Sequence, residues 1–79
     1  MELNEFVKKF AEQFDEIDAN ELKADTEFRT LDEWSSMTGL SIMAMVDDEY
    51  GVIIKGGDLR KSETIEDLFN IVKDYKEKN

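Results

Sequence analysis

The sequence contains no cysteine, no histidine and no proline. Without cysteine the chain can form neither a disulfide framework nor a thiolate metal site. The absence of histidine also excludes zinc sites with nitrogen and sulfur ligands, and the Ser-His and Cys-His pairs of nucleophilic catalysis. A chain of 79 residues has little room for a deep substrate cavity beside its core. We therefore expect no enzymatic activity, no catalytic residue and no metal site.

Basic residues are few. Lysine and arginine together number 10 against 20 aspartates and glutamates, which gives a formal net charge of −10. The whole imbalance lies in residues 1–54, which hold fourteen acids and four bases, whereas residues 55–79 hold six of each. This acidic balance argues against nucleic acid as a partner and favours proteins with basic docking surfaces.

Long apolar runs are lacking as well. The longest uncharged run, residues 34–46, is too short for a membrane-spanning helix, which needs about 20 residues. The first residues are charged throughout and contain no apolar core of a signal peptide. We expect one domain over residues 1–79, located in the cytoplasm and not bound to a membrane.

The spacing of the apolar residues predicts three long helices, at about 4–14, 36–50 and 64–76. Glu2 or Asn4 is the expected start of the first helix. Thr64 is a natural N-cap for the last helix, and Asp67 provides the acid of a capping box. The apolar stripes of these two outer helices are expected to pack in the core, with Leu3, Phe6, Val7, Phe10 and Phe14 from the first and Ile65, Leu68, Phe69, Val72 and Tyr75 from the last.

The first connection, residues 15–35, has no periodic pattern. Loops of this length are uncommon in compact domains unless they are functional or disordered. Scattered apolar residues along it nevertheless predict a loop that is held against the helices, namely Ile17, Leu22, Phe28, Leu31 and Trp34.

In the second connection, Gly51 is expected to end the helix before it. Residues 52–54 are expected to form an apolar plug, because a lone strand would have no partner. Residues 58–61 can form one short helical turn. The expected fold is therefore all-α, a small four-helix bundle of three long helices and one short helical turn, with a long loop between the first two helices.

The second helix has no charge between residues 36 and 46. Its core-facing stripe is expected to be Gly39, Ile42, Met43, Val46 and Tyr50. The opposite stripe should be polar in an exposed helix, yet Met37, Leu40 and Ala44 on it are apolar, alongside Ser41 and Asp48. We favour a partner-facing patch of Met37, Leu40 and Ala44 over the alternative, a central helix with one exposed apolar side.

The same helix ends in Asp47, Asp48 and Glu49. Acids at this position oppose the negative end of the helix dipole and so reduce local stability. A solvated surface is the ordinary explanation of a charge run. The position of these acids beside the apolar patch adds weight to the alternative, a basic docking partner.

Ser36 lies at the N-cap or the first position of this helix. The simplest interpretation is a capping serine. The functional interpretation uses the same geometry, because free N–H groups and the helix dipole stabilise an anion attached to a hydroxyl at this end. With no histidine in the chain and no lysine close in sequence, Ser36 is expected to be modified by another enzyme rather than to act itself.

These features resemble the acyl carrier protein family over nearly the whole chain: its length, its acidity, the long first loop and the stretch SSMTGLSIMAMVDDEYGV. Ser36 matches the serine that receives 4′-phosphopantetheine, and Met37 matches the leucine that follows it. The end of the second helix matches at Asp47, Asp48, Glu49 and Tyr50, and the start of the last helix at Thr64 and Ile65.

The sequence also departs from the family pattern. Ser35 stands where the family usually has aspartate, and it competes with Ser36 as acceptor, although the distance to the acidic end of the helix favours Ser36. Thr38 and Ser41 stand where many fatty-acid carriers have acids that contact partner enzymes. A specialised branch of lipid metabolism therefore fits better than bulk fatty acid biosynthesis.

The resemblance implies a monomeric phosphoprotein whose covalent 4′-phosphopantetheine is attached to Ser36 by a phosphopantetheinyl transferase and carries acyl groups as thioesters. Acyl-loading and acyl-transfer enzymes with basic docking patches would bind at Met37, Leu40, Ala44, Asp47 and Asp48. The alternative is a small acidic helical interaction module without a prosthetic group. A calcium-binding helix pair is disfavoured, because residues 15–25 lack the glycine and glutamate pattern of that loop.

Overall fold

The computed structural model describes residues 1–78 and is mostly helical. Its elements are α1 (Leu3–Ala11), the 3-10 helices η1 (Ala19–Glu21) and η2 (Phe28–Thr30), α2 (Ser36–Tyr50), α3 (Gly56–Lys61) and α4 (Ile65–Lys78). Over these residues there is no strand, only one isolated bridge between Glu27 and Thr64. The prediction of a small all-α bundle is confirmed.

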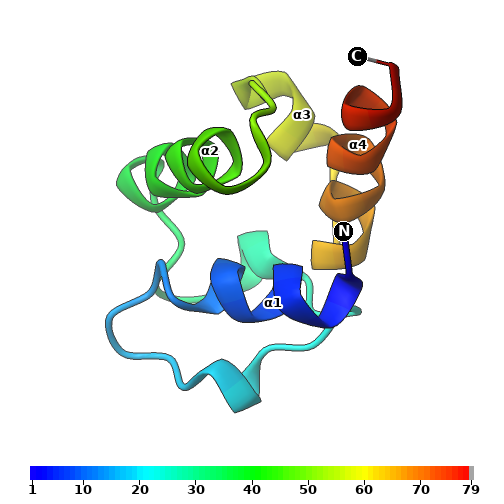
Figure 1. Ribbon diagram of the computed structural model, residues 1–79. Helices are drawn as coiled ribbons and strands as arrows, with labels where there is room; N and C mark the ends of the chain where they lie inside the picture. The colour runs from blue at the N-terminus through cyan, green and yellow to red at the C-terminus, as the bar shows by residue number, and fades with distance from the viewer. Residues whose placement is uncertain (79) are drawn as a thin grey trace.

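In Figure 1, α1 and α2 run across the view, one below the other, and α4 stands across them at the right. The short α3 lies at the top, between α2 and α4. The predicted bounds of the second helix are correct, whereas the first helix ends three residues earlier than predicted, at Ala11 rather than at residue 14. Glu2 is the N-cap of α1, but no side-chain hydrogen bond caps it.

One hydrophobic core joins all four helices and the first connection. The predicted stripes of α1 and α4 lie in it, with Leu3 and Tyr75 only partly buried. An aromatic row runs through this core from Phe14 to Phe10, Phe28 and Trp34, with successive ring centroids 5.8, 5.1 and 5.1 Å apart. Phe14 contributes although it lies beyond α1, because the turn after Ala11 brings it back onto the core.

The first connection is held in place as predicted. Leu22 and Phe28 are buried, and Ile17, Leu31 and Trp34 pack against the core from its edge. Its backbone also meets the start of α4: the N–H groups of Ile65 and Glu66 donate to the carbonyls of Thr26 and Ala24, at 3.2 and 2.9 Å. The loop thereby satisfies helix N–H groups that have no partner within their own helix.

The second connection is partly as predicted. Gly51 ends α2 in the left-handed conformation, with φ of 67°, and its N–H donates to the carbonyl of Asp47 at 2.9 Å. Val52 and Ile54 are buried, but Ile53 between them is 74% exposed. An extended chain places successive side chains on opposite sides, so only two of the three residues can fill the core. The expected short turn is longer than predicted and begins at Gly56.

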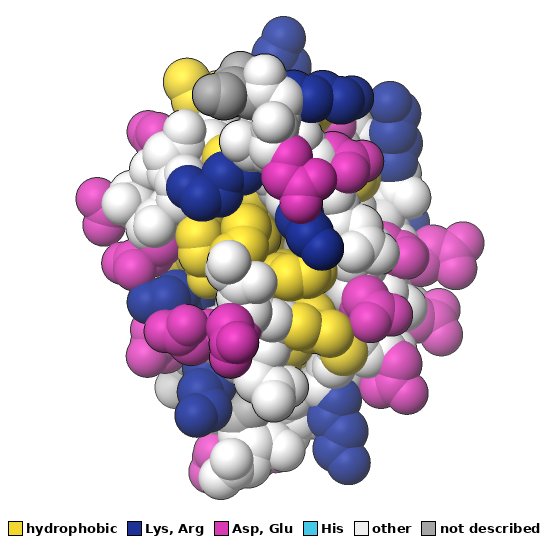
Figure 2. Space-filling view, turned by 45° about the vertical axis from the view of Figure 1, so that its right-hand side comes forward, with side chains coloured by type: hydrophobic (Ala, Val, Ile, Leu, Met, Phe, Trp, Pro, Cys, Tyr) yellow, Lys and Arg dark blue, Asp and Glu magenta, His cyan; other side chains and the backbone are white. Residues whose placement is uncertain are grey.

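In α2 the predicted core stripe is buried at Gly39, Ile42 and Val46 and partly buried at Met43 and Tyr50. Met45, which the predicted stripe does not include, is buried as well. On the outside, the face in Figure 2 shows acidic and basic side chains around a strip of apolar ones. Large exposed hydrophobic residues among residues 1–78 are Met1, Met37, Leu40 and Ile53.

The capping box at the start of α4 gives a testable pH dependence. Thr64 Oγ1 accepts from the N–H of Asp67 at 3.1 Å, and Asp67 Oδ2 accepts from the N–H groups of Thr64 and Glu63 at 3.0 and 3.1 Å. The backbone N–H donors of Thr64 and Glu63 lower the pKa of Asp67 below its ordinary 3.8. The ionised carboxylate therefore stabilises the fold above pH 3.8, and this contribution is lost as the pH falls through the lower pKa of the folded state.

We expect Thr64→Ala to lower the free energy of unfolding by about 1 kcal/mol, because it removes the N-cap acceptor. Asp67→Asn should lower it at neutral pH and make it less sensitive to acid. Urea titrations of both variants at neutral pH and below pH 4 measure the two effects. Asp74→Asn, at an exposed position of the same helix, is the matched control. Equal acid sensitivity in Asp67→Asn and the wild type would contradict the assignment.

Candidate functional site

Two neighbouring serines at the start of α2 have different roles. Ser35 is the N-cap, in an extended conformation, and its Oγ accepts from the N–H of Thr38 at 3.3 Å. Ser36 is the first residue of the helix and is exposed. No hydrogen bond among residues 1–78 uses the Ser36 hydroxyl. The sequence left open whether Ser36 is the cap; the structure puts Ser35 there and leaves the Ser36 hydroxyl accessible.

Thr38 completes this cap and has no role in the sequence-based site. Its Oγ1 donates to the carbonyl of Glu33 at 3.1 Å and lies 3.2 Å from Ser35 Oγ. The hydroxyl thus ties the first turn of α2 to the chain that enters it.

Trp34 fixes the approach to the two serines. Its backbone N–H donates to the backbone carbonyl of Leu31 at 3.0 Å. Its ring lies edge-on to that of Phe28, with centroids 5.1 Å apart and planes at 66°. Because Phe28 is fully buried in the core, this contact determines where the chain enters α2 and therefore where Ser36 lies.

A cavity of about 540 Å³ opens beside Ser36, between α2 and α3. Apolar side chains of α2, of α3 and of the first connection line it, and so do the side chains of Arg29 and Arg60. Its lining residues are Arg29, Trp34, Ser35, Ser36, Gly39, Leu40, Met43, Gly56, Leu59 and Arg60. Sequence reasoning missed this hollow, because residues 29, 36 and 60 are brought together only by the fold.

The two arginines of the cavity are held differently. Arg29 Nε donates to the carbonyl of Ser62 at 3.0 Å, which ties the first connection to the end of α3. Arg60 lies against the glycines at the start of its own helix: a Cβ added at Gly56 would be 3.3 Å from Arg60 Nη1. A Cβ at Gly56 would therefore require the guanidinium group to shift by a few tenths of an ångström.

The predicted partner-binding residues lie together on the surface of α2. Met37 and Leu40 are 78% and 62% exposed, and Ala44 is exposed one turn further along. Positions separated by three and four residues share one face of a helix. Leu40 also lines the cavity beside Ser36, so this patch of Met37, Leu40 and Ala44 adjoins the modification candidate.

The acids at the end of α2 divide into two kinds. Glu49 forms a salt bridge with Lys9 of α1 at 2.8 Å, and this contact raises the pKa of Lys9. Asp47 and Asp48 are exposed and, within residues 1–78, form no salt bridge. Of the three acids at the end of α2, these two therefore remain without an ion-pair partner among the described residues.

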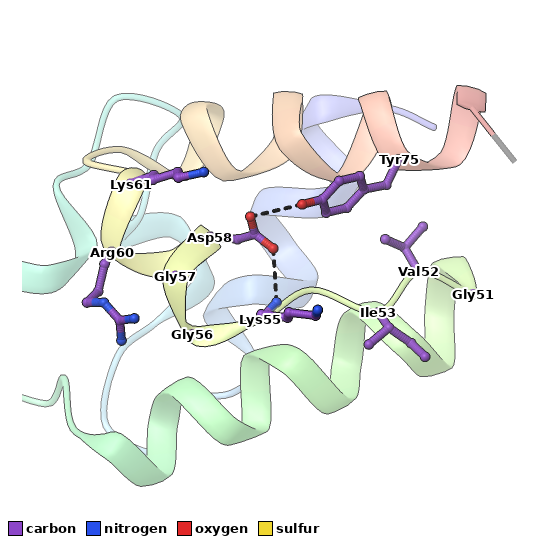
Figure 3. A pocket seen from close by; sticks show the side chains of 10 residues that line it. All are labelled: Gly51, Val52, Ile53, Lys55, Gly56, Gly57, Asp58, Arg60, Lys61 and Tyr75. Carbon is purple, nitrogen blue, oxygen red and sulfur yellow. Dashed lines mark hydrogen bonds between the residues drawn. The ribbon is translucent and has the colours of Figure 1, made fainter.

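A second and larger cavity, of about 850 Å³, is lined by the segment that follows α2 (residues 51–55), by α3 and by Tyr75 of α4 (Figure 3). Asp58 in its wall is buried, and both carboxylate oxygens accept hydrogen bonds: Oδ2 from the N–H of Lys55 and Oδ1 from the hydroxyl of Tyr75, each at 3.0 Å. The bond to Asp58 raises the pKa of Tyr75, so the phenol remains a donor. The sequence-based site includes none of these residues.

Over residues 1–78, no group of three or more acidic side chains is arranged to hold a metal ion. No helix of the described part has the length and apolar character needed to cross a membrane. Comparison with known proteins finds no matching family model, no matching curated protein and no matching solved structure.

Proposed function

We propose that the chain is a carrier protein that bears 4′-phosphopantetheine on Ser36 and shuttles acyl intermediates between the enzymes of a specialised pathway in the cytoplasm. The observation that carries this proposal is the exposed Ser36 hydroxyl, unused by the fold, at the first position of α2 and beside a partly apolar cavity. When attached, the group supplies the terminal thiol that a chain without cysteine lacks, and acyl groups are carried on it as thioesters.

Attachment needs only a nucleophilic oxygen from this chain. A bond forms between Ser36 Oγ and the phosphorus next to the pantetheine of coenzyme A, and the P–O bond to 3′,5′-ADP breaks. The hydroxyl proton leaves to a base of the transferase. The first N–H groups of α2 are unpaired within the helix, and its dipole is positive at this end, so both stabilise the phosphodiester that results.

Ser35 is the less suitable acceptor. Its oxygen is already engaged with the N–H and hydroxyl of Thr38, so modification there would break the helix cap. Loss of an N-cap costs about 0.5–2 kcal/mol. Modification of Ser36 costs no hydrogen bond of the folded chain.

The surface around Ser36 supports docking of a partner with matching chemistry. The exposed apolar side chains of Met37, Leu40 and Ala44 provide a contact area, and Asp47 and Asp48 attract basic groups. A carrier has to leave each enzyme to visit the next, and rim charges with a small apolar centre favour rapid, steered and reversible association.

The first test is attachment itself. Incubation of the protein with coenzyme A and a broad-specificity phosphopantetheinyl transferase should add one 4′-phosphopantetheine per chain, as measured by intact mass. An unmodified product under conditions in which a known carrier is modified would contradict the proposal. It would then favour the second candidate, an interaction module that uses the exposed Met37 and Leu40 without a prosthetic group.

The docking patch gives a separate prediction. Leu40→Glu should slow attachment by about tenfold, equivalent to about 1.4 kcal/mol of docking energy, because it places an acid in the apolar contact area. The free energy of unfolding should change by no more than about 0.5 kcal/mol, since Leu40 is 62% exposed. Ile53→Glu, at a 74% exposed apolar position outside the patch, is the control. Equal initial rates for Leu40→Glu and the control would exclude the patch from docking.

A further inference from the structure

The two cavities described above adjoin along α3. The cavity beside Ser36 and the larger cavity share two lining residues, Gly56 and Arg60. In Figure 3, α2 crosses below α3, and Arg60 lies on the side away from Gly51, which follows the last residue of α2. Because Ser36 begins α2, the two adjoining cavities together extend from Ser36 past Arg60 and on towards Lys55.

The larger cavity is lined by an excess of positive charge. Lys55, Arg60 and Lys61 contribute cations, and Asp58 is the one carboxylate among its lining residues. Both oxygens of Asp58 are occupied by the N–H of Lys55 and the hydroxyl of Tyr75, so this acid already has its hydrogen-bond partners. Over residues 1–78 the one salt bridge joins Lys9 to Glu49, and the three cations of the cavity have no carboxylate partner.

These three exposed cations belong to residues 55–79, which hold six bases and six acids and so lack the acidic excess of the rest of the chain. Cations that line a hollow reinforce one another's potential and attract an anionic group. A guanidinium group binds a carboxylate through two parallel hydrogen bonds. Gly56 leaves room for the Arg60 guanidinium, since a Cβ there would lie 3.3 Å from Nη1. Val52 and Ile53 add apolar surface that suits a hydrocarbon segment next to the charge.

We propose that the cargo carried on Ser36 ends in a carboxylate, and that Arg60, Lys55 and Lys61 bind this carboxylate in the larger cavity. The inference rests on the function proposed above. A neutral cargo would offer these cations no charged partner, whereas a carboxylate at the free end would form ion pairs with them and reduce the positive charge of the cavity.

The phosphodiester of the attached group is a weaker candidate for the same cations. It would be bonded to Ser36 itself, at the cavity that Arg29 and Arg60 line. Lys55 and Lys61 line only the larger cavity, beyond the shared Gly56 and Arg60. An anion that contacts them is therefore expected further along the attached chain.

The test uses a matched pair of cargoes on the full protein. The transferase is supplied with glutaryl-coenzyme A or with its terminal amide, glutaramoyl-coenzyme A, and loading is verified by intact mass. Backbone amide chemical shifts of residues 55–61 and the melting temperature are then compared for the wild type, for Arg60→Gln/Lys61→Gln and for Lys73→Gln. Lys73 is an exposed lysine of α4 that lines neither cavity.

We expect the glutaryl form of the wild type to shift the amides of residues 55–61 more than the amide form does. It should also melt higher, by on the order of 4–8 °C, which corresponds to about one additional net hydrogen bond in a domain of this size. The difference between the two cargoes should be lost in Arg60→Gln/Lys61→Gln and retained in Lys73→Gln.

Other results overturn the inference in distinguishable ways. Equal shifts for the two cargoes, lost in Arg60→Gln/Lys61→Gln, would assign the cations to the phosphodiester instead. A difference between cargoes that survives in that variant would place the carboxylate elsewhere, and no shift at residues 55–61 would show that these cations bind neither group. Failure to load any group on Ser36 would contradict the carrier function itself.

Discussion

Replacing Ser36 by alanine should abolish the covalent adduct completely, whereas replacing Ser35 by alanine should leave it in place. The reason is structural as well as chemical: Ser36 Oγ is exposed and unused, while Ser35 Oγ accepts from the N–H of Thr38. Intact mass of each variant after incubation with coenzyme A and the transferase measures the outcome. A large effect is expected because the change removes the oxygen to which the group is proposed to be bonded.

The two variants should differ in opposite ways: Ser35→Ala should keep the adduct and lose stability, whereas Ser36→Ala should lose the adduct and keep stability. Ser35→Ala is expected to lower the free energy of unfolding by about 0.5–2 kcal/mol, since it deletes the N-cap of α2. Ser36→Ala should be close to neutral, because no hydrogen bond among residues 1–78 depends on its hydroxyl. Ser36→Ala therefore tests attachment in a chain that remains folded.

Two results would contradict this assignment. An adduct that persists in Ser36→Ala and disappears in Ser35→Ala would make the capping residue the acceptor. An adduct that persists in both single variants would place the attachment at another hydroxyl. Peptide mapping of the modified wild type then identifies the position directly.

The local signals of the sequence predict much of this fold. The bounds of α2 follow from Ser36, at the start of an uncharged run, and from Gly51, which follows the acidic end of the helix. The capping box of α4 follows from Thr64 and Asp67 alone. These features depend on residues within a few positions of one another, because helix caps and helix ends are determined by local backbone conformation and local hydrogen bonds. The end of α1 was misplaced because Phe14 continues the apolar spacing, although a turn rather than the helix carries it into the core.

The candidate site was predictable only in part. Ser36, Met37 and Leu40 lie on one helix and could be placed from their spacing. Arg29 and Arg60 could not, because they reach the cavity beside Ser36 from the first connection and from α3. Nor does spacing show that the Asp58 carboxylate is occupied by Tyr75, seventeen positions away. Contacts between distant segments determine which charges of a surface remain free, and these contacts have no signature in the local sequence.

Phe28→Ala is expected to be the most destabilising of the substitutions considered. Phe28 is fully buried, and its ring contacts Phe10 of α1 and Trp34 at centroid distances of 5.1 Å each. Truncation of a buried phenylalanine to alanine costs about 3–5 kcal/mol. A chain of 79 residues has a total stability of roughly 4–12 kcal/mol. The substitution therefore removes a large fraction of the stability that holds the first connection onto the helices.

Urea denaturation measures the loss, and Trp34 reports where it occurs, because it is the only tryptophan of the chain. Its emission should shift to longer wavelength in folded Phe28→Ala, since the ring loses the contact that covers it. Ile53→Ala, at a 74% exposed position, should change stability by less than about 0.5 kcal/mol and leave the emission unchanged. Trp34 precedes the two serines, so a looser loop should also slow attachment to Ser36. Unchanged stability and emission in Phe28→Ala would show that this aromatic contact does not position the site.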